Sequence, residues 1–75
     1  MDQQLDELIA RVLEIPTRQV SDDLSFQSIP QWDSLRHLEL ISALEEAYGV
    51  VIEAEQIVEL SQVAAIRAFV RGLAA

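Results

Sequence analysis

Apolar residues recur at helical spacing in three separate segments of this 75-residue chain. In residues 2 to 15 they are Leu5, Leu8, Ile9, Val12 and Leu13. In residues 34 to 48 they are Leu38, Ile41, Leu44 and Tyr48, with Leu40 and Ala43 widening the stripe. In residues 62 to 73 they are Val63, Ile66, Phe69 and Val70. This spacing predicts three amphipathic helices that each bury one face.

The residues at the predicted helix ends fit these boundaries. Pro16 ends the first helix, because a proline disfavours helical geometry in the residue before it. Gly49 is expected to terminate the second helix in a left-handed conformation. Ser61 is a candidate N-cap for the last helix.

Two connecting segments complete the predicted fold. Residues 16 to 33 show no sustained period and predict a long loop, anchored on the bundle by Val20, Leu24, Phe26, Ile29 and Trp32. We expect Trp32 to pack the loop onto the bundle rather than to touch a substrate. Val50, Val51 and Ile52 predict a buried connector, since no second segment offers a partner strand. Residues 53 to 59 predict a short helix with Ile57 facing inward.

These segments predict one all-α domain over residues 1–75. It is a small four-helix bundle with three longer helices, a short third helix and a long loop between the first and second. The chain has no cysteine, so no disulfide supports this small core, and any thiol chemistry requires a group added after translation.

The charge of the chain limits the partners that it can bind. Thirteen acidic residues face five basic ones, all arginine, for a net charge of −8. Such a balance repels nucleic acid and anionic membrane surfaces, and it suits partners with basic docking patches, although it can also serve solubility alone. No apolar run is long enough to span a membrane, and no secretory signal is evident, so we expect a cytoplasmic protein. We also expect a monomer.

The most distinctive motif is Trp32-Asp33-Ser34-Leu35, at the start of the second predicted helix. A serine there keeps its hydroxyl exposed, while the helix N-terminus favours an attached anion. A plain helix-start serine is one alternative. A hydrolase made of Asp33, Ser34 and His37 is another, but all three lie within one helical turn and the Gly-x-Ser-x-Gly pattern is missing. We expect His37 to be a surface residue, and the scattered acids predict no metal site.

The context of this motif resembles the acyl carrier protein family. The matching residues are Asp33-Ser34-Leu35, Leu38-Glu39-Leu40-Ile41, Leu44-Glu45-Glu46, Gly49 and the run from Leu60 to Val70. Phe26 also lies seven residues before Asp33, as a loop phenylalanine often does in that family. The resemblance covers nearly the whole chain in order.

The resemblance implies a carrier and not an enzyme. Ser34 would receive 4′-phosphopantetheine from coenzyme A through a magnesium-dependent transferase, and Asp33 would support that modification. The arm would end in a thiol that holds acyl groups as thioesters. The second helix would dock partner enzymes through Leu35, Leu38, Glu39, Glu45 and Glu46. Those partners would be the transferase and an acyl-loading enzyme, ketosynthase or acyltransferase with a basic docking patch.

The cargo is less closely defined by the sequence. Helix phase and the resemblance together place a possible acyl pocket at Leu40, Leu44 and Ile57. Pro30-Gln31 replaces the Leu-Gly that the family often has, and Arg36 and His37 make the helix start less acidic than in fatty-acid-synthesis members. A specialised lipid or polyketide pathway is therefore expected. The alternatives are an aminoacyl or peptidyl carrier of nonribosomal synthesis, and an acidic helical interaction module without a prosthetic group.

Overall fold

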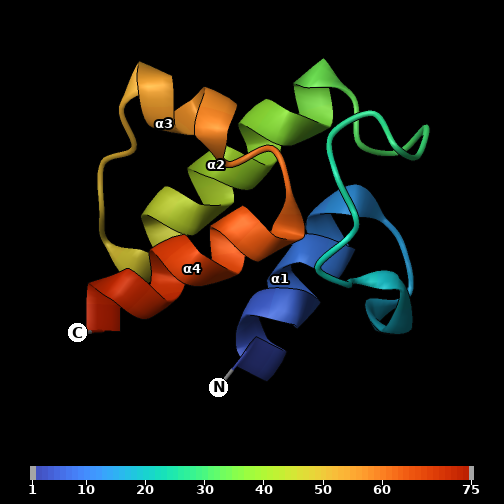
Figure 1. Cartoon of the computed structure of the whole chain (residues 1–75), viewed down its shortest axis with the longest axis horizontal. Helices are drawn as coiled ribbons and strands as arrows, with labels where there is room; N and C mark the ends of the chain where they lie inside the picture. The colour runs from blue at the N-terminus through green and yellow to red at the C-terminus, as the bar shows by residue number, and fades with distance from the viewer. Residues whose placement is uncertain (1, 75) are drawn as a thin grey trace.

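The computed structural model describes residues 2–74, which form four α-helices and one short 3-10 helix. The α-helices are α1 (Asp2–Leu13), α2 (Ser34–Tyr48), α3 (Ala54–Glu59) and α4 (Val63–Ala74), and the 3-10 helix η1 spans Thr17–Gln19. Within these residues the backbone forms no strand, only one isolated antiparallel bridge between Ser25 and Gln62. The all-α prediction is confirmed. Figure 1 shows α1, α2 and α4 packed together, with the short α3 at one edge beside α2.

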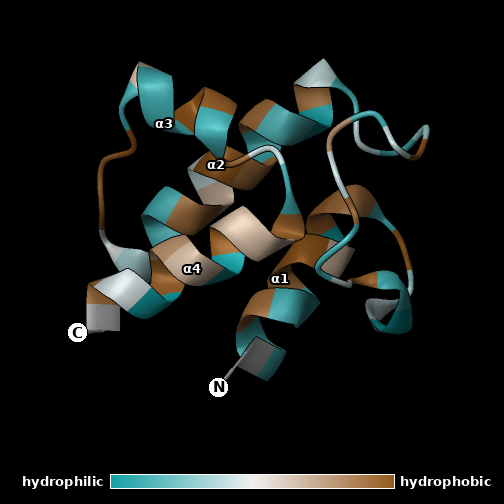
Figure 2. Cartoon of the chain, in the orientation of Figure 1, coloured by the Kyte–Doolittle hydropathy of each residue, from teal (hydrophilic) through white to brown (hydrophobic). Residues whose placement is uncertain are grey.

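One continuous core holds the three longer helices together. Teal and brown alternate along the helices in Figure 2, as expected where each helix buries one face. The largest fully buried side chains are Trp32, Leu5, Ile9, Leu13, Leu40, Leu44, Ile66 and Val63. Most of the predicted core is therefore confirmed. The prediction is wrong for Leu38, which was expected on the buried apolar stripe of α2 but is 56% exposed.

The end of α1 differs from the prediction by two residues. The helix stops at Leu13 because Glu14 adopts a left-handed conformation, with φ of 58°. The amide of Ile15 then donates to the carbonyl of Ala10 over 3.0 Å, and the amide of Glu14 donates to Arg11 over 3.3 Å. This pairing is a Schellman motif, which satisfies carbonyls left unpaired at a helix end. Pro16 follows the motif and does not itself end the helix.

The end of α2 lies where the sequence predicts. Gly49 is left-handed with φ of 64°, and its amide donates to the carbonyl of Glu45. The amide of Val50 donates to that same carbonyl over 3.2 Å. The connector that follows is only partly buried: Ile52 belongs to the core, but Val51 is 79% exposed. The prediction of a buried connector is wrong at Val51.

Backbone hydrogen bonds join the long loop between α1 and α2 to the segment at the start of α4. The amide of Phe26 donates to the carbonyl of Ser61 over 2.8 Å, and the amide of Val63 donates to Leu24 over 2.9 Å. As predicted, Trp32 packs into the bundle, where it is fully buried. Ser61 lies two residues before the first residue of α4, one residue further than predicted.

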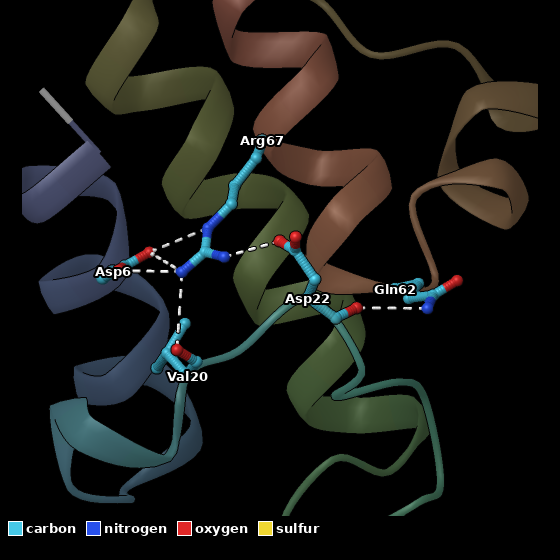
Figure 3. Close-up of polar contacts among 5 residues, drawn as sticks. All are labelled: Asp6, Val20, Asp22, Gln62 and Arg67. Atoms are coloured by element: carbon cyan, nitrogen blue, oxygen red, sulfur yellow. Dashed lines mark hydrogen bonds and ion pairs between the residues drawn. The ribbon is translucent and has the colours of Figure 1, made fainter.

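Arg67 joins α4 to α1 and to the loop, as Figure 3 shows. Its guanidinium forms an ion pair with Asp6 at 2.9 Å and another with Asp22 at 2.6 Å, and it also donates to the carbonyl of Val20. The hydrogen bonds that Arg67 donates to Asp6 are the main reason why the pKa of Arg67 lies above its ordinary value, against the opposing effect of burial.

Candidate functional site

Ser34 is the first residue of α2 and its side chain is exposed. The preceding residue, Asp33, is extended and caps the helix: its Oδ1 accepts a hydrogen bond from the amide of Arg36 over 2.9 Å. Ser34 therefore lies on a fixed helix start, beside backbone N–H groups that have no partner within the helix. This position gives a hydroxyl that an external enzyme can reach and a local field that favours a phosphodiester.

The structure explains why that helix start is rigid. Trp32, two residues before Ser34, is fully buried, and its backbone carbonyl accepts from the amide of Gln27 over 2.9 Å. The turn before it is closed by Ser28, whose hydroxyl donates to the carbonyl of Ser25 over 2.6 Å. Ser34 is thus exposed, two residues after a side chain that is anchored in the core.

The predicted docking residues occupy different environments on α2. Leu35 is 67% exposed, and Leu38, Glu39 and Glu46 are also exposed. Glu45 is only half-buried, and its Oε2 accepts from the amide of Ile52 over 2.9 Å, so its carboxylate also holds the segment that leads to α3. Leu35 and Leu38 are large apolar side chains left in solvent next to Ser34.

Arg36 does not present an unpaired positive charge beside Ser34. Its guanidinium lies 3.4 Å from a carboxylate oxygen of Glu14 and 3.7 Å from one of Glu39. It also donates to the carbonyl of Val12 over 3.4 Å, so it ties the start of α2 to the end of α1. The sequence indicated the charge of Arg36 but not these partners.

An apolar hollow lies beside α2, next to its first turns. It is lined by Phe26, His37, Ile57, Val58 and Ser61 and has a volume of about 330 Å³. Of the three residues predicted to contact an acyl chain, Ile57 lines this hollow, whereas Leu40 and Leu44 are fully buried in the core. Phe26, Val58 and Ser61 were not predicted to share a site with Ile57. The sequence offered one signal for Phe26, namely its match to the loop phenylalanine of the family that the chain resembles.

His37 is the largest departure from the sequence prediction. It was expected at the surface, but it is only 8% exposed. Its Nδ1 lies 3.0 Å from the indole Nε1 of Trp32, and its Nε2 lies 2.8 Å from the carbonyl oxygen of Ile57. The spacing of Trp32 and His37, five residues apart across a helix start, was the only sequence signal for this contact. The hydrolase alternative finds no support, because both ring nitrogens of His37 have partners other than Ser34.

Two further observations bear on the type of site. Among residues 2–74, no group of three or more histidine, aspartate and glutamate side chains lies close enough to hold a metal ion. None of the helices in the described part of the chain has the length and apolar character that crossing a bilayer requires.

Comparison with known proteins identifies the family. Residues 3–70 match the family described as phosphopantetheine attachment site, whose members carry 4′-phosphopantetheine covalently. The chain is also similar to polyketide-8 synthase acyl carrier protein 2 of Streptomyces avermitilis, with 44% identity over 54 residues. That match covers 71% of this chain and 62% of the length of the relative. The exposed serine at the capped helix start and the family match over nearly the whole chain lead to one conclusion: this chain belongs to the phosphopantetheine-binding family of acyl carrier proteins.

Proposed function

We propose that this chain carries acyl groups as thioesters on a 4′-phosphopantetheine arm attached to Ser34. The observation that carries the proposal is the exposed Ser34 on a capped and anchored helix start, within a chain that matches the family over residues 3–70. The arm would supply a terminal thiol, which this cysteine-free chain lacks. Family members are carriers rather than enzymes.

Asp33 is proposed to support the modification while it caps α2. Only its Oδ1 is engaged in the hydrogen bond with Arg36, so the charge of the carboxylate remains available to the metal of a transferase. Ser34 would form the phosphodiester. The carboxylate of Asp33 would attract the metal ion of the transferase, and the free N–H groups of the first turn would attract the phosphate of the donor.

The exposed face of α2 is proposed as the docking surface for partner enzymes. Leu35 and Leu38 offer apolar contacts beside Ser34, and Glu39, Glu45 and Glu46 supply negative charge for a basic patch on the partner. Fast association and easy release suit a carrier that must visit several enzymes. The name of the Streptomyces relative supports a polyketide pathway as the class of chemistry served.

The experiment that tests this function is intact-mass spectrometry after incubation with coenzyme A and a broad-specificity phosphopantetheinyl transferase. The wild-type protein is expected to gain one phosphopantetheinyl group, and Ser34→Ala is expected to gain none. Ser42→Ala is the matched control, because Ser42 is an exposed serine of the same helix. A wild-type protein that gains no mass would instead be an interaction module without a prosthetic group.

The class of cargo requires a second experiment. The loaded protein is incubated with an acyltransferase and a malonyl donor, and in parallel with amino-acid-activating enzymes and ATP. Acylation from the malonyl donor supports the acyl carrier. Transfer of an amino acid instead would assign the chain to nonribosomal synthesis.

A further inference from the structure

His37 links three segments that meet beside the attachment site. It belongs to α2, one helical turn after Ser34, and it contacts Trp32 of the long loop and Ile57 of α3. The ring of Phe26 lies against it as well, with ring centroids 5.3 Å apart. Among the polar and charged side chains that the structure describes, only His37 is buried.

The two partners of His37 determine its tautomer. The indole of Trp32 can only donate, so Nδ1 of His37 must be the unprotonated acceptor. The carbonyl of Ile57 can only accept, so Nε2 must carry the proton. Only the neutral ring with its proton on Nε2 forms both bonds, and each ring nitrogen is therefore assigned by its neighbour.

The bond to Ile57 holds an element that is otherwise weakly attached. None of the six residues of α3 is buried, and Val58 is 74% exposed. The carbonyl of Ile57 belongs to the last turn of α3, where carbonyls have no partner within the helix. His37 supplies that partner from α2. The hydrogen bond is thus both a cap for α3 and a tie between α3 and α2.

This tie also forms part of the wall of the apolar hollow. Phe26, Val58 and Ser61 complete the lining with His37 and Ile57. Further along the same face of α2, Leu40 and Leu44 are fully buried, so the hollow does not continue into the core. A longer apolar group can extend along α2 only if α3 moves away, and the Nε2 contact with Ile57 opposes that movement.

We propose that His37 is a positioning residue that acts as a latch between α2 and α3. The proposal rests on the carrier function assigned above. With the latch closed, a group carried on Ser34 stays outside and accessible to partner enzymes. When the Nε2 bond to Ile57 opens, α3 separates from α2 and an apolar chain is sheltered between them. His37 therefore sets the balance between a sheltered and a presented cargo.

The test compares two variants that fill the site differently. His37→Phe keeps an aromatic ring of similar size but forms neither hydrogen bond. His37→Gln is the matched conservative variant, since its amide can accept from the indole and donate to the carbonyl. Each protein is loaded with an octanoyl or an acetyl group from the corresponding coenzyme A ester, and loading is verified by intact mass. Failure to load would count against the carrier function and is seen before the latch is tested.

The first readout is the rate at which hydroxylamine cleaves each thioester. We expect octanoyl cleavage to be slower in His37→Phe than in wild type, by up to about fivefold, because one net hydrogen bond of about 1 kcal/mol shifts the equilibrium between the two states by that factor. Acetyl cleavage should not change, and His37→Gln should behave as wild type. A merely structural role would alter both thioesters alike. Equal effects on both, or no effect on octanoyl, would overturn the proposal.

The second readout uses wild-type protein alone, so it does not depend on the folding of a variant. In ¹⁵N–¹H spectra, octanoyl loading should shift the amides of Ala54–Glu59 and the Nε2 resonance of His37, and acetyl loading should leave both in place. Octanoyl loading that leaves the α3 amides and Nε2 unchanged would refute the latch, because the chain would then not require α3 to move.

Discussion

Asp33 serves helix stability and, in the proposed function, modification of Ser34, and these two contributions can be separated by mutation. Its Oδ1 accepts from the amide of Arg36 over 2.9 Å, the geometry of an N-cap. The capped helix α2 supplies Leu40 and Leu44 to the core, so loss of the cap should be felt by the whole fold. Replacing an N-cap aspartate with alanine costs about 1 kcal/mol, whereas asparagine caps about as well as aspartate.

Asp33→Asn and Asp33→Ala should therefore differ in stability but not in modification. Urea denaturation is expected to show a loss of about 1 kcal/mol for the alanine variant and little change for asparagine. Transferase kinetics at a fixed coenzyme A concentration should show both variants reduced, because both lack the carboxylate charge. If the lost contact with the metal is worth at least as much as a hydrogen bond to a charged group, about 1.5–3 kcal/mol, kcat/KM should fall at least about 10-fold to 150-fold.

The matched control is Asp23→Asn, which removes one negative charge from an exposed loop position. It should leave both the stability and the loading rate near wild type. If Asp33→Asn loads as fast as wild type, the carboxylate has no part in modification and Asp33 acts as a cap alone. If Asp33→Asn is as unstable as Asp33→Ala, the capping argument itself is wrong.

Four further predictions concern other parts of the chain. Arg67→Met should lower the free energy of unfolding by about 2 kcal/mol, measured by urea denaturation, because it removes charged hydrogen bonds to the half-buried Asp6; the exposed Arg18→Met should change it little. Because the pKa of Arg67 is raised, its contribution to the free energy of unfolding is fully present below the ordinary pKa of arginine and is lost only above the raised value. Titration of Arg67 should therefore not change the stability between roughly pH 6 and pH 9. Gly49→Ala should cost about 1 kcal/mol in thermal denaturation, since alanine is strained at φ of 64° although no atom lies within 4 Å of the added Cβ, and Gly49→Asn should cost less. Glu46→Lys should slow association with a basic partner enzyme in stopped-flow measurements at low salt, and an effect that persists at about 1 M salt would contradict an electrostatic role.

The periodic part of the fold was predictable because it depends on local patterns. The spacing of Leu5, Ile9 and Leu13 and the glycine at position 49 identify α1 and the end of α2 directly. The boundary of α1 was missed because Glu14 is not a residue type that signals a left-handed conformation. Leu38 was misplaced because its spacing fits the apolar stripe equally well, and only the packing of α1 and α4 decides which face of α2 is covered.

The position of Asp33 and Ser34 at a helix start was predictable from the sequence, and the burial of His37 was not. Histidine is intermediate in its tendency to be buried, so its residue type alone does not place it in the core or at the surface. Its burial depends on Trp32 from the loop and on a carbonyl of α3, and Ile57 lies twenty residues further along the chain. A sequence does not indicate which backbone carbonyl a side chain will meet, so a contact of this type is visible only in three dimensions. The same holds for Glu45, whose carboxylate binds the amide of Ile52.

The backbone hydrogen bonds between the long loop and residues 61–63 have a consequence for the folding of the chain during its synthesis. Leu24 and Phe26 find their backbone partners in Val63 and Ser61, which the ribosome adds long after Ser34. A nascent chain that has exposed α1 and α2 but not the start of α4 lacks the backbone partners that order the loop. We expect the serine to acquire its finished surroundings only when α4 has emerged, so a modifying enzyme that reads those surroundings would act after α4 has been made and not before.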